Sequence, residues 1–257
     1  MVAGGSDGTG AAFSRQLARR SVNVVLIARR APLLDELAGE LRAEYSVDAR
    51  AVVCDLSAPD AITTLRAQTN DIEVGLLVYN AGADPRMTQY LDTSLDDLHA
   101  MVHRNATTVV DTVHHYGAGM VARGRGGVIL VTSGAAWAGA SHLAIYGATK
   151  AFDLILAEAL WAEWRERGVD VLSLVLGATD TPSYRRLLEQ NGRDVPSQVA
   201  DPDTVVTDAL DHLSDGPTRL AGMPDPAGPS PFGSMARRDA VTIMSQAVAS
   251  HLPDDPG

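Results

Sequence analysis

Short apolar runs alternate with segments of helical period along most of the chain, and this alternation restricts the fold more than any other feature. The runs are continuous in Val, Leu and Ile, which is typical of strands that are covered on both faces. They span residues 22–28, 49–54, 74–80, 126–133 and 169–177. Strands and helices in this order are joined by right-handed crossovers. The sequence therefore predicts an α/β fold, a doubly wound parallel β-sheet flanked by helices on both faces.

Helices are predicted between the apolar runs. Pro32 suits the first turn of a helix, and Leu34, Leu37, Ala38 and Leu41 form one apolar stripe after it. The same reasoning places further helices near residues 9–20, 59–69, 97–122, 146–167 and 202–213.

A Pro/Gly-rich stretch at residues 224–233 interrupts this pattern before a last helix. In that helix Val241, Met244, Val248 and Leu252 are expected to share one face. At 257 residues and 46% hydrophobic content the chain can bury the core of one domain. We expect that domain to cover residues 1–222, with residues 223–257 as a linker and a helix packed on the same domain or on a neighbouring subunit.

The charge and the cysteine content exclude several classes of partner. A net charge of -11 and a pI near 5.0 argue against nucleic acid, anionic membranes and polyanionic substrates. The single cysteine, Cys54, lies in an apolar run and is expected to be a buried, reduced thiol. No run approaches the roughly 20 apolar residues of a membrane span, and the start lacks the features of a signal peptide. We therefore expect a cytoplasmic protein with no membrane span.

A glycine-rich turn, AGGSDGTG at residues 3–10, precedes the first predicted helix. Gly4, Gly8 and Gly10 would let the backbone approach a pyrophosphate, and the helix N-terminus would supply N–H groups to it. Taken alone, a glycine-rich start is more often a flexible tail. Because only three residues precede Gly4 and a strand normally has about 5, the first strand is expected to be stunted or cut by a late start.

Further motifs follow this turn in a fixed order. They are DL at 55–56, NAG at 80–82, Asn105, Ser133 and Y-x-x-x-K at 146–150. In order and spacing, the set resembles the short-chain dehydrogenase/reductase family over residues 3 to about 222. The resemblance implies a Rossmann-like fold and an oxidoreductase that binds NAD(P).

The resemblance also implies a set of cofactor-binding positions. The glycine turn would line the pyrophosphate and adenosine ribose, the next loops would border the adenine and back the middle of the cofactor, and a segment after the run at 169–177 would anchor the carboxamide. These positions are Gly4, Ser6, Asp7, Gly8, Thr9 and Gly10; Asp55 and Leu56; Asn80, Ala81 and Gly82; and Gly177, Thr179 and Thr181. Leu176 replaces the usual proline, so we expect a less rigid turn there.

Two arginines, Arg29 and Arg30, follow the run at 22–28, where such enzymes usually select their cofactor. An acidic residue at this place would bind the 2′-hydroxyl of NAD, whereas a guanidinium can bind the 2′-phosphate of NADP. NADP(H) is therefore predicted. NAD(H) remains the alternative, because exposed arginines often follow strands and Asp7 nearby is acidic.

Tyr146 and Lys150 are four positions apart, so on a helix both can point into one cleft. The resemblance implies that Tyr146 is the acid/base and that Lys150 favours the ionised phenol and bonds the nicotinamide ribose. Ser133 would polarise the substrate oxygen, and Asn105 would hold a water that links Lys150 to solvent. No metal is expected, because none of the seven histidines has the spacing of a metal ligand.

This set predicts an NADP(H)-dependent oxidoreductase that interconverts a secondary alcohol and a ketone. The alternatives are a non-catalytic NADP(H)-binding sensor or scaffold, and an epimerase or dehydratase that uses the cofactor catalytically. Substrate contacts are expected from residues 178–197, which read as a mobile loop, and from Trp137, His142 and Leu143. Trp137 and Leu143 hint at an apolar substrate, although core packing explains them equally well.

A homodimer or homotetramer is expected through the helices at 97–122 and 146–167. Trp161 and Trp164 lie on the second of these helices and are candidates for that contact.

Overall fold

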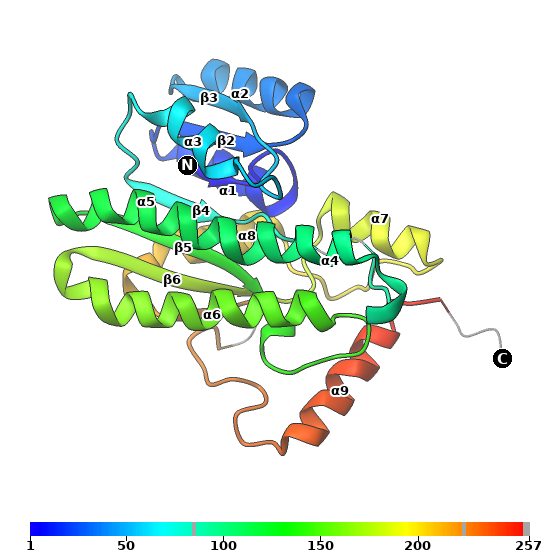
Figure 1. Ribbon diagram of the computed structural model, residues 1–257. Helices are drawn as coiled ribbons and strands as arrows, with labels where there is room; N and C mark the ends of the chain where they lie inside the picture. The colour runs from blue at the N-terminus through cyan, green and yellow to red at the C-terminus, as the bar shows by residue number, and fades with distance from the viewer. Residues whose placement is uncertain (84–85, 223–224, 254–257) are drawn as a thin grey trace.

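The computed structural model describes residues 1–83, 86–222 and 225–253. Its centre is a seven-stranded sheet in the order β3-β2-β1-β4-β5-β6-β7, in which all neighbours are parallel (Figure 1). The strands are β1 Val2–Ala3, β2 Val24–Ala28, β3 Ala49–Val53, β4 Leu76–Tyr79, β5 Gly126–Ser133, β6 Val169–Leu176 and β7 Thr218–Ala221. Each of the five apolar runs contains a strand, and the predicted fold class is confirmed.

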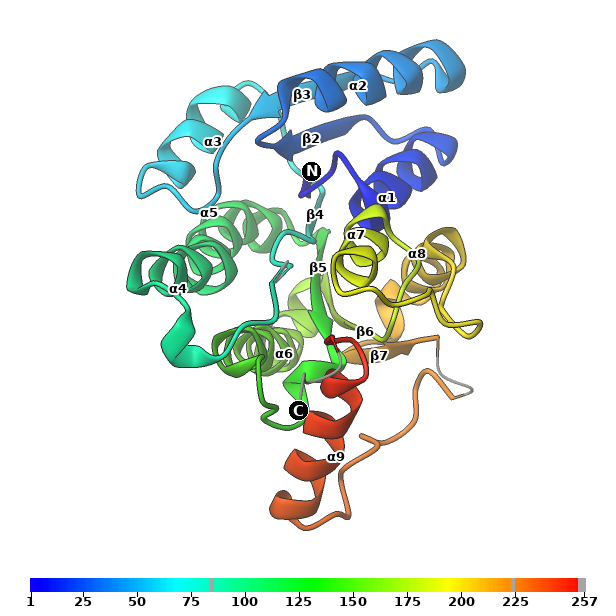
Figure 2. The same cartoon turned by 90° about the vertical axis from the view of Figure 1, so that its right-hand side faces the viewer.

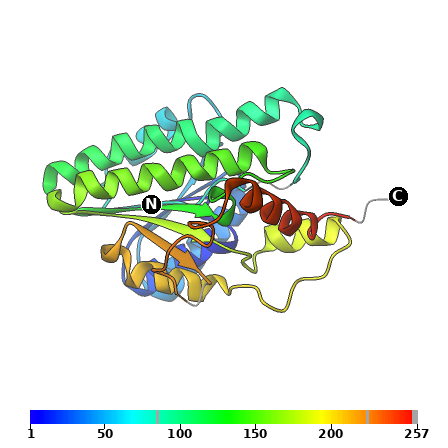
Figure 3. The same cartoon turned by 90° about the horizontal axis from the view of Figure 1, so that it is seen from below.

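Helices cover both faces of the sheet (Figure 3). One face carries α1 Gly8–Arg19, α2 Ala31–Tyr45 and α8 Pro202–Asp211, and the other carries α3 Ala61–Thr69, α5 Thr108–Arg123 and α6 Ala144–Trp164. Neighbouring strand residues point to opposite faces, so Leu26 joins the first core layer and Ile27 joins the second. Three more helices, α4 Leu95–Val102, α7 Pro182–Gln190 and α9 Arg237–Ala249, surround the edge at which the strands end (Figure 2).

The first strand is short, as expected, and yet central. β1 has two residues, and Val2 pairs with Leu26 of β2 on one side and Val78 of β4 on the other. The terminal amino group of Met1 donates a hydrogen bond to the carbonyl of Leu76 at 2.9 Å. Burial lowers the pKa of this amine to about 5.

The helix predicted at 97–122 is interrupted, and that prediction was wrong in its continuity. A π-helical turn at His103–Thr107 separates α4 from α5. Asn105, in the middle of this turn, is fully buried, and its side-chain amide donates to the Gly82 carbonyl and to Thr149 Oγ1. Single π-helical turns often occur at functional sites, and here the turn directs an asparagine away from the helix surface.

Residues 178–197 are not simply a loop, because they contain α7. Thr181 caps this helix by accepting a hydrogen bond from the Tyr184 backbone N–H at 3.2 Å, and Pro182 occupies its first turn. Leu187 and Leu188 of this helix are buried. The sequence missed the helix because only one turn of it carries apolar residues.

The last helix packs on the rest of the chain with a face that differs from the predicted one. Val248 is buried and packs in one cluster with Ala135 and Leu143, but Val241 is 40% exposed. Leu252 lies beyond the end of α9. The first residue of the predicted 224–233 linker lies outside the described residues.

The two tryptophans of α6 pack within the chain. The Trp161 ring lies 4.5 Å from the guanidinium carbon of Arg165 and covers Gly216. Trp164 lies against Gly117 of α5, where an added Cβ would come within 2.5 Å of the indole. Within the described residues, no helix is both long enough and apolar enough to cross a membrane.

Candidate active site

The glycine turn lies at the point where the strand order reverses, between β1 and β4. Asn80, which follows β4, donates through its side-chain amide to the Gly4 carbonyl at 3.3 Å. Gly4 has a φ of +77°, and a Cβ there would lie 3.0 Å from the Ala81 nitrogen. A Cβ at Gly10 would lie 1.9 Å from the Gly4 carbonyl oxygen. The turn therefore leaves bare backbone at a crevice where open α/β sheets bind ligands.

Asp7 caps α1 and also forms an ion pair with an arginine. Its Oδ1 accepts from the Gly8 backbone N–H at 2.9 Å, and its Oδ2 lies 2.9 Å from Arg30 and 3.5 Å from Arg186. Burial raises the pKa of Asp7, but the hydrogen bonds from Arg30 and Gly8 outweigh it, and the net shift is downward. Arg29 is exposed and has no hydrogen bond or ion pair among the described residues. Of the two predicted arginines, Arg30 forms an ion pair with Asp7 and Arg29 is exposed to solvent.

Asp55 and Leu56 lie in the loop that follows β3. Asp55 is exposed and its carboxylate accepts from the Ser57 backbone N–H, whereas Leu56 is buried. Thr9 of the glycine turn is buried and Ser6 is half-buried.

The segment after β6 meets the glycine turn. A Cβ at Gly8 would lie 3.0 Å from the side chain of Thr181. Thr179 Oγ1 donates to the carbonyl of the exposed Gly177 at 3.2 Å, and Thr179 pairs with Ala200 in an isolated parallel bridge. These bonds hold the turn that was expected to be less rigid without a proline.

Lys150 is buried on α6, at the same level of the sheet as Gly82. Its ammonium donates to the Val131 carbonyl of β5 at 2.9 Å and to Asp153 Oδ2 at 3.1 Å. A Cβ at Gly82 would lie 3.0 Å from Lys150 Nζ and 3.0 Å from Asn105 Oδ1. Three of the predicted positions, far apart in sequence, thus converge.

Tyr146 lies one turn earlier on α6 and is half-buried. It packs against the apolar cluster of Ala135, Leu143 and Val248. Its carbonyl accepts from Thr149 Oγ1 at 2.9 Å, and that hydroxyl accepts in turn from Asn105. This chain of bonds links the π turn to the helix that carries Tyr146 and Lys150.

Ser133 ends β5 close to the first turns of α6. Its Oγ accepts from the Ala135 backbone N–H at 3.2 Å. The Ala135 carbonyl oxygen lies close to Gly147, since a Cβ added there would come within 3.1 Å of it. Gly147 therefore lets the serine turn settle against the helix of Tyr146.

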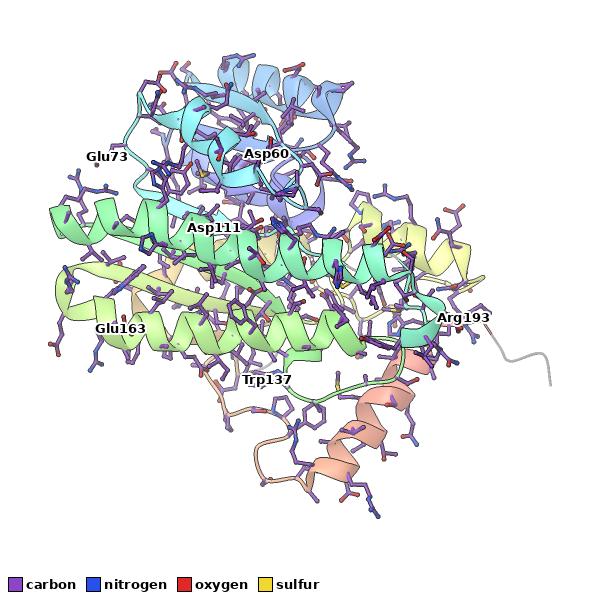
Figure 4. The ribbon with its side chains drawn as sticks, viewed as in Figure 1. Asp60, Glu73, Asp111, Trp137, Glu163 and Arg193 are labelled. Atoms are coloured by element: carbon purple, nitrogen blue, oxygen red, sulfur yellow. The ribbon has the colours of Figure 1, made fainter. Side chains whose placement is uncertain are left out.

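Two of the three predicted substrate contacts, Leu143 and His142, lie beside Tyr146. Leu143 packs against it, and His142 lines a small hollow of about 20 Å³ together with Tyr146. Trp137 packs against the core cluster of Leu154, Val175 and Leu220. It lies on the side of α6 toward the segment that leads to α9 (Figure 4).

Sequence reasoning missed Asp153, whose side chain is 3% exposed. The available signal was a carboxylate on the buried face of a predicted helix, three residues after Lys150. It also missed two contacts just beyond the end of α9. Tyr184 Oη lies 3.0 Å from His251 Nε2, and Arg193 donates to the Leu252 carbonyl at 2.8 Å. Together these contacts hold the end of α9 against α7.

A larger hollow of about 360 Å³ adjoins the glycine turn on the side of α1 and α2. Tyr146 and Lys150 do not line it, so its position says nothing about catalysis. Among the described residues, no group of three or more His, Cys, Asp or Glu side chains is placed to hold a metal ion.

Comparisons with known proteins agree with this geometry. The family model for short chain dehydrogenases matches residues 1–192. The chain is 34% identical over 224 residues to a 7beta-hydroxysteroid dehydrogenase of Collinsella aerofaciens, covering 86% of this chain and 85% of that protein. It is 30% identical to the very-long-chain 3-oxoacyl-CoA reductase of Homo sapiens, over 68% of this chain and 57% of that protein.

Two solved structures are similar over nearly the whole chain. A structure from a study of 7beta-hydroxysteroid dehydrogenase stereoselectivity has a TM-score of 0.86 and 31% identity, with 95% of each chain covered. A short-chain dehydrogenase from Sphingobium yanoikuyae in complex with NADPH has a TM-score of 0.77 and 27% identity, with 100% of this chain and 96% of that chain covered.

Proposed function

Because this chain belongs to the short-chain dehydrogenase/reductase family, and is thus an NAD(P)-dependent oxidoreductase acting on CH–OH groups, we propose that it uses NADP(H) and interconverts a secondary alcohol and a ketone with Tyr146 as acid/base. The observation that carries the proposal is the convergence of Gly82, Asn105 and Lys150 one helical turn from Tyr146. Chemistry at a dinucleotide needs such groups at the carboxyl edge of the sheet, and this convergence supports the proposal.

The residues around the crevice fit a dinucleotide. The glycine turn would bind the pyrophosphate through bare backbone and the N-terminal end of α1, which starts at Gly8. Arg29 would bind the 2′-phosphate, with Arg30 in support, and this contact is the basis for NADP(H) over NAD(H). The remaining cofactor contacts would come from Asp55, Leu56, Asn80, Ala81, Gly82, Gly177, Thr179 and Thr181. When bound, NADP(H) supplies or accepts the hydride.

The chain's own groups would handle the proton. Tyr146 would donate its phenolic proton to the oxygen of a ketone, or accept the hydroxyl proton of an alcohol. The ammonium of Lys150 would favour the ionised phenol, because an opposite charge at close range stabilises an anion. Ser133 would hold the substrate oxygen, and Asn105, bonded to Gly82 and Thr149, would keep the π turn in place beside Lys150.

The substrate is proposed to be bulky and apolar. The wall beside Tyr146 consists of Ala135, Leu143 and Val248, and α9 closes over it. Hydroxysteroids are the first class to test, since similar proteins are named 7beta-hydroxysteroid dehydrogenase.

The proposed assembly and location rest on exposed apolar side chains and on a buried cysteine. Apolar side chains on the outer faces of α4, α5 and α6 are exposed, and they support a homodimer or homotetramer through these helices. They are Val102, Val110, Phe152 and Ile155. We propose residues 1–222 as the catalytic domain, followed by the linker and α9, and a cytoplasmic location consistent with the buried thiol of Cys54.

The deciding experiment removes a single hydroxyl. Tyr146→Phe should bind NADPH as the wild type does and lose about 10²- to 10⁴-fold in turnover of a steroid ketone, the usual contribution of a positioned acid. Tyr45→Phe is the matched control, because the hydroxyl of Tyr45 accepts from Arg19 far from the crevice. A wild type that binds NADPH but reduces nothing in a carbonyl panel would support the sensor instead. Substrate conversion without net change in NADPH absorbance would support the epimerase or dehydratase.

A further inference from the structure

A buried carboxylate lies beside the lysine and has no part in the chemistry described above. Asp153 follows Lys150 by three positions on α6, and their side chains are 3% and 4% exposed. Asp153 Oδ2 accepts from the ammonium at 3.1 Å, whereas Oδ1 is buried and has no hydrogen-bond partner among the described residues. A half-satisfied buried carboxylate is costly to stability. Its position next to Lys150 therefore calls for a functional reason.

The carboxylate limits how the ammonium can turn. A lysine ammonium has three N–H donors, and the Val131 carbonyl and Asp153 Oδ2 accept two of them. The close approach of Gly82 and Asn105 lies on the remaining side. With both acceptors in place, the third N–H is left for the side of Gly82 and Asn105. With Val131 alone, the ammonium could rotate about a single bond.

Ionisable groups near the pair come from β4 and the π turn, whereas β5 supplies polar groups alone. Tyr79 of β4 is fully buried, and burial together with the charge of Asp153 raises its pKa. Arg104 of the π turn donates to Asn105 Oδ1 and accepts, through its carbonyl, from the Tyr79 hydroxyl. β5 contributes only the Val131 carbonyl and the hydroxyl of Thr132, which donates to the Lys150 carbonyl. The groups that act on Tyr79 from further away are Asp111 and Cys54. Asp153 is thus the carboxylate in contact with the ammonium.

We propose that Asp153 is a positioning residue, which orients the Lys150 ammonium toward the crevice and holds it in the charged form. The inference rests on the proposed function only in the role given to Lys150, because the pairing itself is a property of the fold. Burial raises the pKa of Asp153 to about 6, against the opposing charge of Lys150. The carboxylate is therefore ionised at neutral pH and protonated in mild acid.

The chain offers an unusually direct test, because Lys150 is the only lysine among its 21 basic residues. Protein labelled with ¹³C at lysine Cε gives one lysine resonance, which reports the charge of this ammonium without any substrate. In Asp153→Asn the midpoint of that titration should fall by about 1–3 pH units relative to the wild type, the usual effect of an adjacent opposite charge. Asp208→Asn is the matched control. It breaks the pair of Asp208 with Arg219 on the other face and should leave the lysine midpoint unchanged.

A second measurement needs no variant. In the wild-type protein the lysine resonance should show a smaller inflection near pH 6, where Asp153 takes up its proton. The absence of this inflection, or an unchanged midpoint in a folded Asp153→Asn, would overturn the inference.

The two proposals can fail separately. With a steroid ketone, the alkaline limb of the pH–rate profile of Asp153→Asn should move by the same amount as the lysine resonance. If the resonance moves and the pH–rate profile does not, the pairing stands and the catalytic role of Lys150 is refuted.

Discussion

Arg29→Ala should weaken NADPH binding about 10- to 150-fold and leave NADH binding nearly unchanged. Arg29 directly follows β2, is exposed, and makes no hydrogen bond or ion pair among the described residues. A hydrogen bond between charged groups contributes about 1.5–3 kcal/mol, which corresponds to that range of affinity. NADH lacks the 2′-phosphate, so the same substitution removes no comparable contact.

Arg30→Ala should have a smaller effect, about 2- to 30-fold on NADPH. Its guanidinium already bonds Asp7 at 2.9 Å, and the two side chains are 50% and 28% exposed. An exposed ion pair of this kind contributes about 0–1 kcal/mol. A phosphate must compete with it, so the net gain from Arg30 is reduced by that amount.

The measurement is the dissociation constant of each dinucleotide, taken from the change in nicotinamide fluorescence at one fixed ionic strength, because salt screens exposed charges. Arg238→Ala, at an exposed position of α9, changes the net charge equally and serves as the control. Equal weakening of NADPH and NADH by Arg29→Ala, or no change in either, would refute the assignment of the phosphate site.

Three further outcomes are expected. Gly10→Ala should lower the melting temperature and abolish NADPH binding, because its Cβ would lie 1.9 Å from the Gly4 carbonyl oxygen. Gly39→Ala is the matched control: no atom lies within 4 Å of a Cβ at this position of α2, so the substitution should stabilise the protein by about 0.5–1 kcal/mol. Tyr184→Phe removes the bond to His251 and should raise the KM for a bulky ketone more than that for NADPH, whereas a uniform loss of activity would contradict a role for α9 in the substrate wall. Burial raises the pKa of Cys54 to about 11, so at pH 8 iodoacetamide should label the native thiol about 100-fold more slowly than the unfolded one. Because the unfolded thiol loses its proton first, the free energy of unfolding should fall as the pH rises from about 9 toward 11. Fast native labelling would argue against that burial.

The sequence predicted the parallel sheet well because its strands are covered on both faces. Continuous apolar runs such as those of β5 and β6 have few other stable environments, and both strands lie close to the predicted bounds. β7 was missed because Thr218–Ala221 has only two buried residues. α7 was missed because its polar side chains resemble those of a loop, although Thr181 and Pro182 form a recognisable helix start.

The break between α4 and α5 could not be read from a helical period. The period of residues 97–122 continues through Asn105, whereas in the structure a π turn places the asparagine side chain within hydrogen-bond distance of Gly82 and Thr149. Those partners are 23 and 44 residues away in the chain. A local pattern contains no information about such contacts.

By itself the sequence determined the layer architecture and the identity of the candidate groups, because apolar periodicity and motif spacing are local properties of the chain. Only the tertiary structure decided how those groups meet. It paired Arg30 with Asp7, left Arg29 exposed, and packed Val248 of α9 into the apolar cluster beside Tyr146. It also placed the Asp153 carboxylate against the Lys150 ammonium, where both side chains are almost fully buried. Burial and distance set the strength of such charge interactions, and both exist only once the helices have packed on the sheet.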